Sequence, residues 1–426
     1  MAINENFLSF LWQFRLFTAQ PLYCVDGERL RVIHPGWLNT HAGPDFMQAT
    51  LEIGGVRWVG NVEIHVNASD WFLHNHELDK SYDSVVLHVV YAHDRAIYRG
   101  NQTLIPAFEI KEIFDVRYLQ QYQQLINERT VFPCAAQVTH VDPLTVSWML
   151  SRVLADRLER KSDELLQQVK HLQGDWEAAL YHCLARSFGF KTNTVPFELL
   201  AASLRHPILV KHHRDPLQVD ALIFGQAGFL AGAFEEIYPQ QLQEEYNYLR
   251  KKWRLVPIDV SLWKFLRMRP ASFPTVRLAQ FAALMWRTPV LFAELMHCRE
   301  LHELHHFFEQ LSTASYWDHH YTFKKVSAGA HTHMGISSVN SILINAFCIV
   351  LYSYGKHTAN QEYKDRAISF LEEIAAERNH LVDSYAENGI KIENAFDSQA
   401  ILELNKYYCS QKKCLNCGIG VKLLKR

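Results

Sequence analysis

The spacing of apolar residues changes once along this chain, and that change limits the folds open to it. Between about residues 30 and 110, short runs rich in β-forming residues are separated by Gly, Pro and Asn. After VFPCAAQ (131–137), apolar residues recur every three to four positions, as in DRAISFLEEIAAERN (365–379). The sequence therefore predicts an α+β fold, with a sheet-bearing N-terminal region followed by a mostly helical region from about 140 to 405.

We expect three segments: an N-terminal α/β domain over 1–135, a helical domain over 136–405 and a Cys-rich basic tail over 406–426. A helical stripe of apolar residues covers 5–17. Strands are expected at about 29–34, 46–53, 56–66 and 84–92, with Gly54 and Gly55 forming the hairpin turn between the second and third. The stretch 69–83 is predicted to be a helix or an ordered loop, with Ser69 or Asp70 as its N-cap.

Charge and hydropathy restrict the partners of the protein. The formal net charge of the 426 residues is −2, so any binding to nucleic acid must rest on a local basic patch. The first residues lack the features of a secretory signal, and no uninterrupted apolar run approaches the roughly 20 residues that span a bilayer. The sequence therefore predicts a cytoplasmic protein with no membrane partner, and it leaves the oligomeric state open.

Two carboxylates stand where neighbouring strands would bring them together. Asp45 follows Pro44 at the start of one predicted strand, while Glu63 and His65 lie two residues apart near the end of the next. Alternation along a strand puts Glu63 and His65 on one face. Magnesium and manganese prefer carboxylate oxygens, and a bound divalent metal activates water and stabilises the charge on a transferring phosphoryl group. We therefore predict a Mg²⁺ or Mn²⁺ site at Asp45 and Glu63.

The order of a helical Glu, Pro-Asp and Glu-x-His resembles the PD-(D/E)XK nuclease-like superfamily over roughly residues 5 to 92. The resemblance implies a helix–strand–strand–strand core and a nuclease activity on DNA or RNA. It also implies that Asp45 and Glu63 bind the metal, that the Ile64 backbone carbonyl is a further ligand and that Glu5 orients the site. His65 stands where the superfamily has lysine. A histidine there can bind metal, act as a base or mark a relative that has lost catalysis.

Histidines are unusually dense around this pattern, with seven between His34 and His93. Residues of ligand type near Glu63 and His65 are His41, His74, His76, Asp79 and His88. The His-x-His pair followed by acidic residues also resembles cupin-type metal sites, although the glycines that frame the cupin motif are missing. The alternative for the carboxylates is a turn aspartate and a solvated strand glutamate, and for each histidine a structural role.

The C-terminal stretch YCSQKKCLNCGIGVKLLKR carries Cys409, Cys414 and Cys417 in a C-x4-C-x2-C pattern. Two thiolates in a CxxC turn grip one tetrahedral ion, so we expect zinc or an iron–sulfur cluster, with Cys134 as the fourth ligand or a histidine in its place. A cluster of reduced structural thiols is the alternative. Two basic groups are candidates for phosphate contacts, one over 250–254 and one made of Lys412, Lys413, Lys422, Lys425 and Arg426, and the alternative for each group is a set of solvated surface lysines and arginines.

Taken together, HPGWLNTHAGPDF, GNVEIHVNASDW, LHVVY, LIFGQAGFL and YYCSQKKCLNCGIG resemble an uncharacterised bacterial protein family that brings no established activity with it. The leading hypothesis is a metal-dependent nuclease, or a nucleic-acid-binding relative that has lost catalysis. The alternatives are a non-catalytic helical interaction protein whose N-terminal domain is a binding module, and a cupin-like metal enzyme that acts on a small molecule.

Overall fold

The computed structural model describes residues 3–18, 20–39, 41–329 and 333–426. The chain forms two compact units, the first made of residues 1–149 and 405–426, the second of residues 150–404. The segment that the sequence set apart as a tail therefore belongs to the sheet-bearing unit. The α+β prediction is confirmed, because a mixed sheet precedes a mostly helical region.

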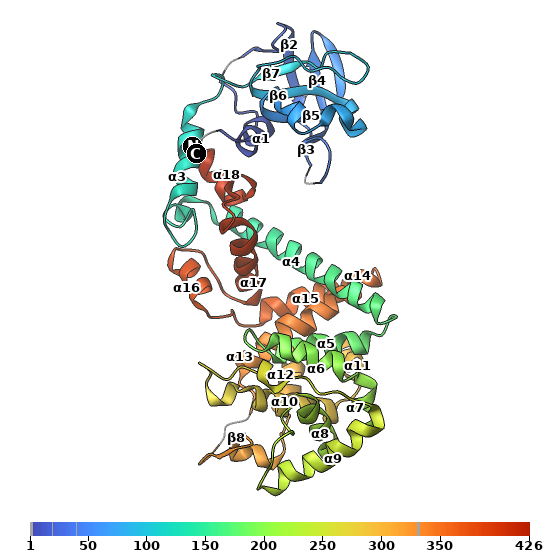
Figure 1. The fold of residues 1–426 in the computed structure, drawn as a ribbon. Coiled ribbons are helices and arrows are strands. Elements are labelled where there is room, and N and C mark those ends of the chain that lie inside the picture. Colours follow the sequence, from blue (N-terminus) through green and yellow to red (C-terminus); the bar gives the residue numbers. More distant parts are fainter. Residues whose placement is uncertain (1–2, 19, 40, 330–332) are drawn as a thin grey trace. The chain divides into compact units, whose positions relative to one another are not determined.

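The first unit is built on a seven-stranded sheet with the order β1-β2-β4-β5-β6-β7, in which β3 pairs with β4 (Figure 1). Pairings from β1 to β5 are antiparallel, and β6 lies parallel to both β5 and β7. The strands are β1 (Leu22–Tyr23), β2 (Arg29–His34), β3 (Trp37–Leu38), β4 (Phe46–Ile53), β5 (Val56–Asn67), β6 (Val85–Ala92) and β7 (Ala107–Glu109).

The four predicted strands are confirmed as β2, β4, β5 and β6. Gly54 and Gly55 form the predicted turn, since Ile53 pairs with Val56 across it and both glycines have positive φ. The first six residues of β6 are buried, as expected for a strand covered on both faces. The sequence did not reveal β1, β3 and β7, because runs of two or three residues carry no readable alternation.

Helix α1 (Glu5–Gln13) begins where predicted and ends four residues early. Its N-cap is Asn4, whose side chain accepts a 2.9 Å hydrogen bond from the Phe7 amide. Arg15 adopts a left-handed conformation (φ 53°) that turns the chain away from the helical path. The buried face of α1 packs against β5, which brings Glu5 to the side of the sheet that carries Glu63.

The crossover from β5 to the parallel strand β6 contains α2 (Asp70–Leu73), η1 (His76–Leu78) and η2 (Lys80–Ser84). Ser69 is the N-cap residue of α2, but its side chain bonds to Asp94 instead of capping the helix. Trp71 and Tyr82 anchor the crossover in a small apolar core with Ala68, Val85, Val90, Ile97 and Ile105. The segment 69–83 is therefore an ordered loop made of short helical turns.

The rest of the first unit consists of helices that follow the sheet and of the C-terminal segment. Helix α18 contacts both α3 and η3, so the C-terminus lies beside the segment that leaves the sheet (Figure 1). The elements are α3 (Val116–Asn127), η3 (Val138–His140), the start of α4 (Pro143–His171), η8 (Asn405–Cys409), η9 (Cys414–Asn416) and α18 (Gly418–Leu424).

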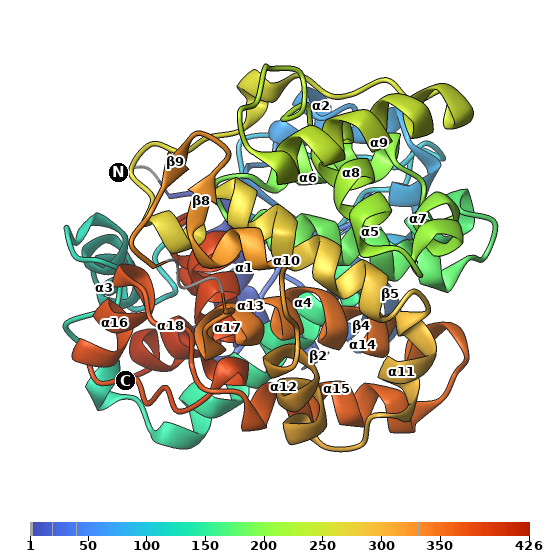
Figure 2. The same ribbon diagram turned by 90° about the horizontal axis from the view of Figure 1, so that it is seen from below.

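The described residues of the second unit form mostly helices, together with the short pair β8 (His320–Thr322) and β9 (Lys325–Val326), which confirms the prediction for this part of the chain (Figure 2). Helix α8 packs against α9 and α10, and α14 packs against α15. After α4 its helices are α5 (Trp176–Phe188), α6 (Thr194–Ser203), α7 (His206–His212), α8 (Pro216–Gln226), α9 (Ile237–Trp253), α10 (Pro274–Arg287), α11 (Leu291–His297), α12 (Leu301–Glu309), α13 (Ile336–Ile342), α14 (Cys348–His357), α15 (Gln361–Glu373), α16 (His380–Glu387) and α17 (Ala395–Leu404), with the shorter turns η4 (Val260–Leu262), η5 (Pro270–Ser272), η6 (Ser315–Asp318) and η7 (Leu343–Phe347).

Among the described residues, one continuous helix, Ile336–His357, has the length and apolar composition that would allow it to cross a membrane. Its most apolar window is 67% buried within the protein, as in a core helix of a globular unit.

Helix α8 carries a buried carboxylate that should make stability depend on pH. Asp220 is 5% exposed and accepts a 2.7 Å hydrogen bond from the Tyr238 hydroxyl. Burial raises the pKa of Asp220 to about 7. The folded protein therefore binds the proton of the Asp220 carboxyl group more tightly than the unfolded chain does. The free energy of unfolding falls as the pH rises from about 4, the ordinary aspartate pKa, through the folded pKa of Asp220.

Asp220→Asn keeps an acceptor for Tyr238 and cannot ionise. We expect this variant to raise the free energy of unfolding by roughly 2 kcal/mol at pH 8 and to change it little at pH 4. Denaturant unfolding at the two pH values measures the difference. An equal effect at both would mean that the ionisation of Asp220 does not control stability.

Candidate metal site

Asp45 and Glu63 lie side by side at one end of the sheet. Phe46 pairs with Val62 across β4 and β5, so the next positions in register are Asp45 and Glu63. The Asp45 amide donates to Glu63 Oε2 (3.0 Å), and the Ile64 amide donates to Asp45 Oδ2 (3.0 Å). These reciprocal hydrogen bonds fix both carboxylates in one place. The predicted role of the Ile64 carbonyl as a ligand stays a prediction.

Three imidazoles stand next to Glu63. His65, His74 and His76 each offer a ring nitrogen, and these nitrogens lie within 4.8 Å of one another. Glu63 Oε1 is 3.2 Å from His76 Nε2 and 3.6 Å from His65 Nε2. His76 Nε2 is buried, and its approach to Glu63 Oε1 lacks hydrogen-bond geometry, so this nitrogen is open to a further ligand. Three imidazoles and a carboxylate are a donor set that suits a divalent transition metal such as manganese or zinc.

A fourth histidine, His88, lies behind His65 and is fully buried. The two belong to neighbouring parallel strands, and His65 Nδ1 is 2.8 Å from His88 Nε2. If His65 donates its Nδ1 proton to His88, its Nε2 keeps a lone pair that faces His74 and Glu63. Metal-binding histidines are commonly oriented by such a hydrogen bond from the other ring nitrogen. His88 therefore positions His65.

The turn between α2 and η1 brings His74 and His76 to the same side. Asn75, which separates them, adopts the left-handed conformation (φ 58°) that asparagine tolerates better than most residues. The ring of His76 stacks on Tyr82 at a centroid distance of 3.8 Å and meets the edge of Trp71. The aromatic core of the crossover therefore fixes His76, while His74 lies at the solvent-exposed side.

Electrostatics favour a cation at this site. Burial, followed by the neighbouring Glu63, raises the pKa of Asp45, because two carboxylates in a partly desolvated place repel each other. Burial, followed by His88, His76 and His74, lowers the pKa of His65 to about 2, and burial lowers that of His88 to about 3. Both rings are therefore neutral at physiological pH. His65 can donate a lone pair, but it cannot supply the permanent positive charge of a lysine.

Glu5 faces the same site from α1. It interacts electrostatically with His74, Glu63 and His76, and burial raises its pKa. Asp79 lies close enough to His76 to interact with it, but its side chain is exposed and caps the Ser81 amide. His41 is exposed in the loop before β4, where its amide donates to Asn39. Glu5 therefore joins the predicted group, and Asp79 lies at its border.

Sequence reasoning assigned metal ligation to Asp45, Glu63 and Ile64 and noted His74 and His76 only as neighbours. The geometry adds both histidines to the site. The His-x-His spacing was the available signal. The left-handed turn at Asn75, which brings both histidines to the same side, could not be predicted from the sequence. The likeness to cupins does not hold, because cupins are jelly rolls and β5, β6 and β7 form a parallel sheet segment.

The two oxygens of Glu63 face different neighbours. Oε2 lies toward Asp45, and Oε1 lies toward His76 and His65. Glu63 can therefore contribute to a carboxylate-rich position with Asp45 and to an imidazole-rich position with the histidines.

The cysteines lie elsewhere in the first unit. Cys134 is buried on the turn that leads into η3, Cys409 ends η8, Cys414 begins η9, and Cys417 precedes α18. All four are reduced cysteines. The segments that carry them meet, since η9 contacts η8 and α18 contacts η3.

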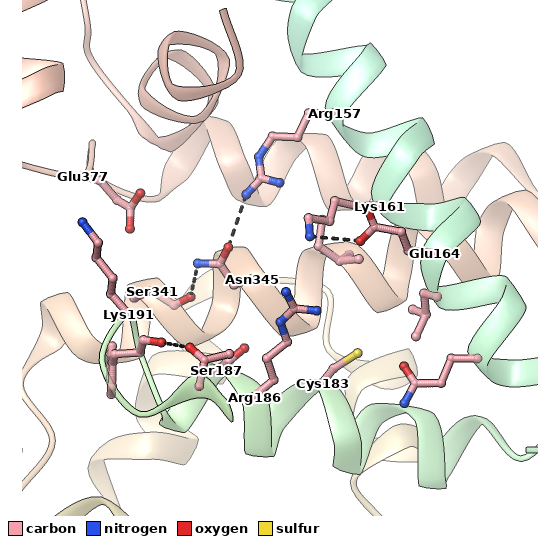
Figure 3. A pocket seen from close by; sticks show the side chains of 15 residues that line it. Arg157, Lys161, Glu164, Cys183, Arg186, Ser187, Lys191, Ser341, Asn345 and Glu377 are labelled. Carbon is pink, nitrogen blue, oxygen red and sulfur yellow. Dashed lines mark hydrogen bonds and ion pairs between the residues drawn. The ribbon is translucent and has the colours of Figure 1, made fainter. Parts of the chain in front are cut away.

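The second unit contains a cavity of about 570 Å³ between α4, α5 and the π-helical turn η7 (Figure 3). Arg157 points toward Asn345 in it and donates to its side-chain oxygen at 3.2 Å. Two of its other cations are already paired, Lys161 with Glu164 and Arg186 with Glu198. The cavity holds none of the predicted site residues.

Comparison with known proteins places the chain in a family. Residues 5–380 match the family described as "Protein of unknown function (DUF2851)". The match includes Glu5, Asp45, Glu63 and the histidine group and ends before Cys409. No curated protein and no solved structure matches the chain. Because the match covers most of its length, the chain belongs to the DUF2851 family.

Proposed function

We propose that the sheet-bearing unit is a divalent-metal-dependent hydrolase that cuts phosphodiester bonds of DNA or RNA. The observation that carries the proposal is the convergence of Asp45, Glu63 and His65 from neighbouring strands, joined by His74 and His76.

The residues fit manganese or magnesium at the carboxylates and manganese at the imidazoles. A bound divalent cation lowers the pKa of a coordinated water and stabilises charge on the phosphoryl oxygens. Asp45 and Glu63 would hold it, and the hydrogen bond from Ile64 keeps Asp45 oriented. His65 and His76 would complete the donor set, with His88 fixing the ring of His65. Glu5, on α1, would orient the site.

Two further features support nucleic acid as the substrate class. The succession of α1, antiparallel β2, β4 and β5, and parallel β6 agrees with the helix–strand–strand–strand core of the PD-(D/E)XK superfamily. In the same unit, a groove of about 630 Å³ is lined by Lys422, Lys425 and Arg426, and by Asp142, which pairs with Lys422 at 3.4 Å. Such cations contact phosphates without reading sequence.

A cytoplasmic location remains our expectation.

A second candidate function is nucleic-acid binding without cleavage. It is favoured by one observation: the neutral His65 replaces the superfamily's lysine, so the cation beside the attacking water is missing.

The experiment is a cleavage assay of the purified full chain on single- and double-stranded DNA and RNA with Mg²⁺ or Mn²⁺. Cleavage that a chelator abolishes and that added metal restores would support the proposed hydrolase. Binding at low salt without cutting under any metal supports the second candidate. A protein that neither cuts nor binds nucleic acid would contradict the proposal of a nucleic-acid substrate.

A further inference from the structure

We propose that Cys134, Cys409, Cys414 and Cys417 together bind one thiophilic metal centre that fastens the C-terminal segment to the sheet-bearing unit. The centre is a zinc ion or an iron–sulfur cluster, since four thiolates serve both. It is separate from the carboxylate–imidazole site and does not depend on the proposed function.

The first support is the contact between segments that carry cysteines far apart in sequence. Cys134 lies on the turn after α3, where its carbonyl accepts from the Val138 amide (2.8 Å). The other three come from the last residues of the chain, and η9, which begins at Cys414, contacts both α1 and α3. Cys134 interacts electrostatically with each of the other three cysteines. Four thiols collected from both ends of one unit match the number that either centre requires.

The second support is the burial of these thiols. Cys134, Cys414 and Cys417 are 6–9% exposed. A thiophilic cation would bind these buried sulfurs in their deprotonated form and supply the opposing charge.

The third support is the local structure that a metal would stabilise. The C-terminal segment consists of η8, η9 and the seven-residue α18, and helices this short are unstable by themselves. Gly420 lies so close to Cys414 that an added Cβ would stand 2.2 Å from its carbonyl oxygen. The backbone is therefore folded tightly around Cys414, as in the turns that hold metal-binding thiolates.

The test begins with wild-type protein purified without chelators and without oxygen. We expect about one zinc per chain, or iron with acid-labile sulfide and visible absorption; either result supports the centre and identifies it. Native alkylation gives a readout that needs no variant. The four thiols should react at least tenfold faster after a strong chelator has removed the metal.

Variants assign the ligands. Cys134→Ser and Cys414→Ser should each lose most of the bound metal, while Cys183→Ser, in the second unit, should keep it. His65→Ala should also keep the thiolate-bound metal. Wild-type protein with neither zinc nor iron and with four rapidly alkylated thiols would overturn the proposal. A metal content that stays unchanged in every variant of the four cysteines would also overturn the proposal.

Discussion

Asp45→Ala should lower the metal-dependent cleavage rate at least about a thousandfold, which corresponds to roughly 4 kcal/mol of transition-state stabilisation. The Asp45 carboxylate faces Glu63 and is oriented by the Ile64 amide at 3.0 Å. Its removal leaves the metal short of a ligand and leaves Glu63 without the neighbour that shares the cation. Steady-state cleavage kinetics under saturating Mn²⁺ measure the loss.

Two variants make this result specific. Asp45→Asn keeps an oxygen that accepts the Ile64 hydrogen bond and removes the charge, so it should fold normally and still lose most activity. Asp26→Ala removes an exposed carboxylate that accepts only from the Glu28 amide in the turn before β2, and it should cut at the wild-type rate. Cleavage by Asp45→Ala within tenfold of wild type would rule out a catalytic metal at this carboxylate.

His65→Lys should reduce cleavage at least about a hundredfold and weaken metal binding with it. An ammonium has no lone pair to donate, and the 1% exposed position of His65 penalises a charge. The substitution also breaks the 2.8 Å contact with His88. Isothermal titration with Mn²⁺ and cleavage kinetics report the two losses separately.

The matched control is His41→Lys, because His41 is exposed in the loop before β4, where its amide donates to Asn39. Activity that persists or rises in His65→Lys would show that the histidine only replaces the lysine of the PD-(D/E)XK superfamily. In that case His65 would not be a ligand, and the metal would rest on the carboxylates alone.

The fold class and the main strands could be predicted because their signals are local. Two glycines between alternating runs define the β4–β5 hairpin. The placement of Asp45 opposite Glu63 depends in addition on the register shift between Phe46 and Ala49, which the sequence does not reveal. The end of α1 could not be placed, since the turn at Arg15 interrupts an apolar pattern that continues to residue 17. Patterns of apolar residues do not encode such backbone conformations.

The imidazole part of the site depends on contacts between segments that are separate in the sequence. His65 meets His88 because β5 and β6 are parallel neighbours, and His76 is held by Tyr82 in the core of the crossover. The contact between the segments around Cys134 and the C-terminal cysteines likewise depends on the path of the whole chain. The residue types and the CxxC spacing marked these side chains as candidates, but tertiary packing decides which of them meet.

The most direct test of the central claim is to locate a metal by anomalous diffraction from crystals of the full chain grown with Mn²⁺. The account predicts an anomalous peak at Glu63, with ligands from Asp45 or from His65, His74 and His76 at about 2.0–2.3 Å. Crystals that show no peak there, at a Mn²⁺ concentration that supports full cleavage, would contradict it.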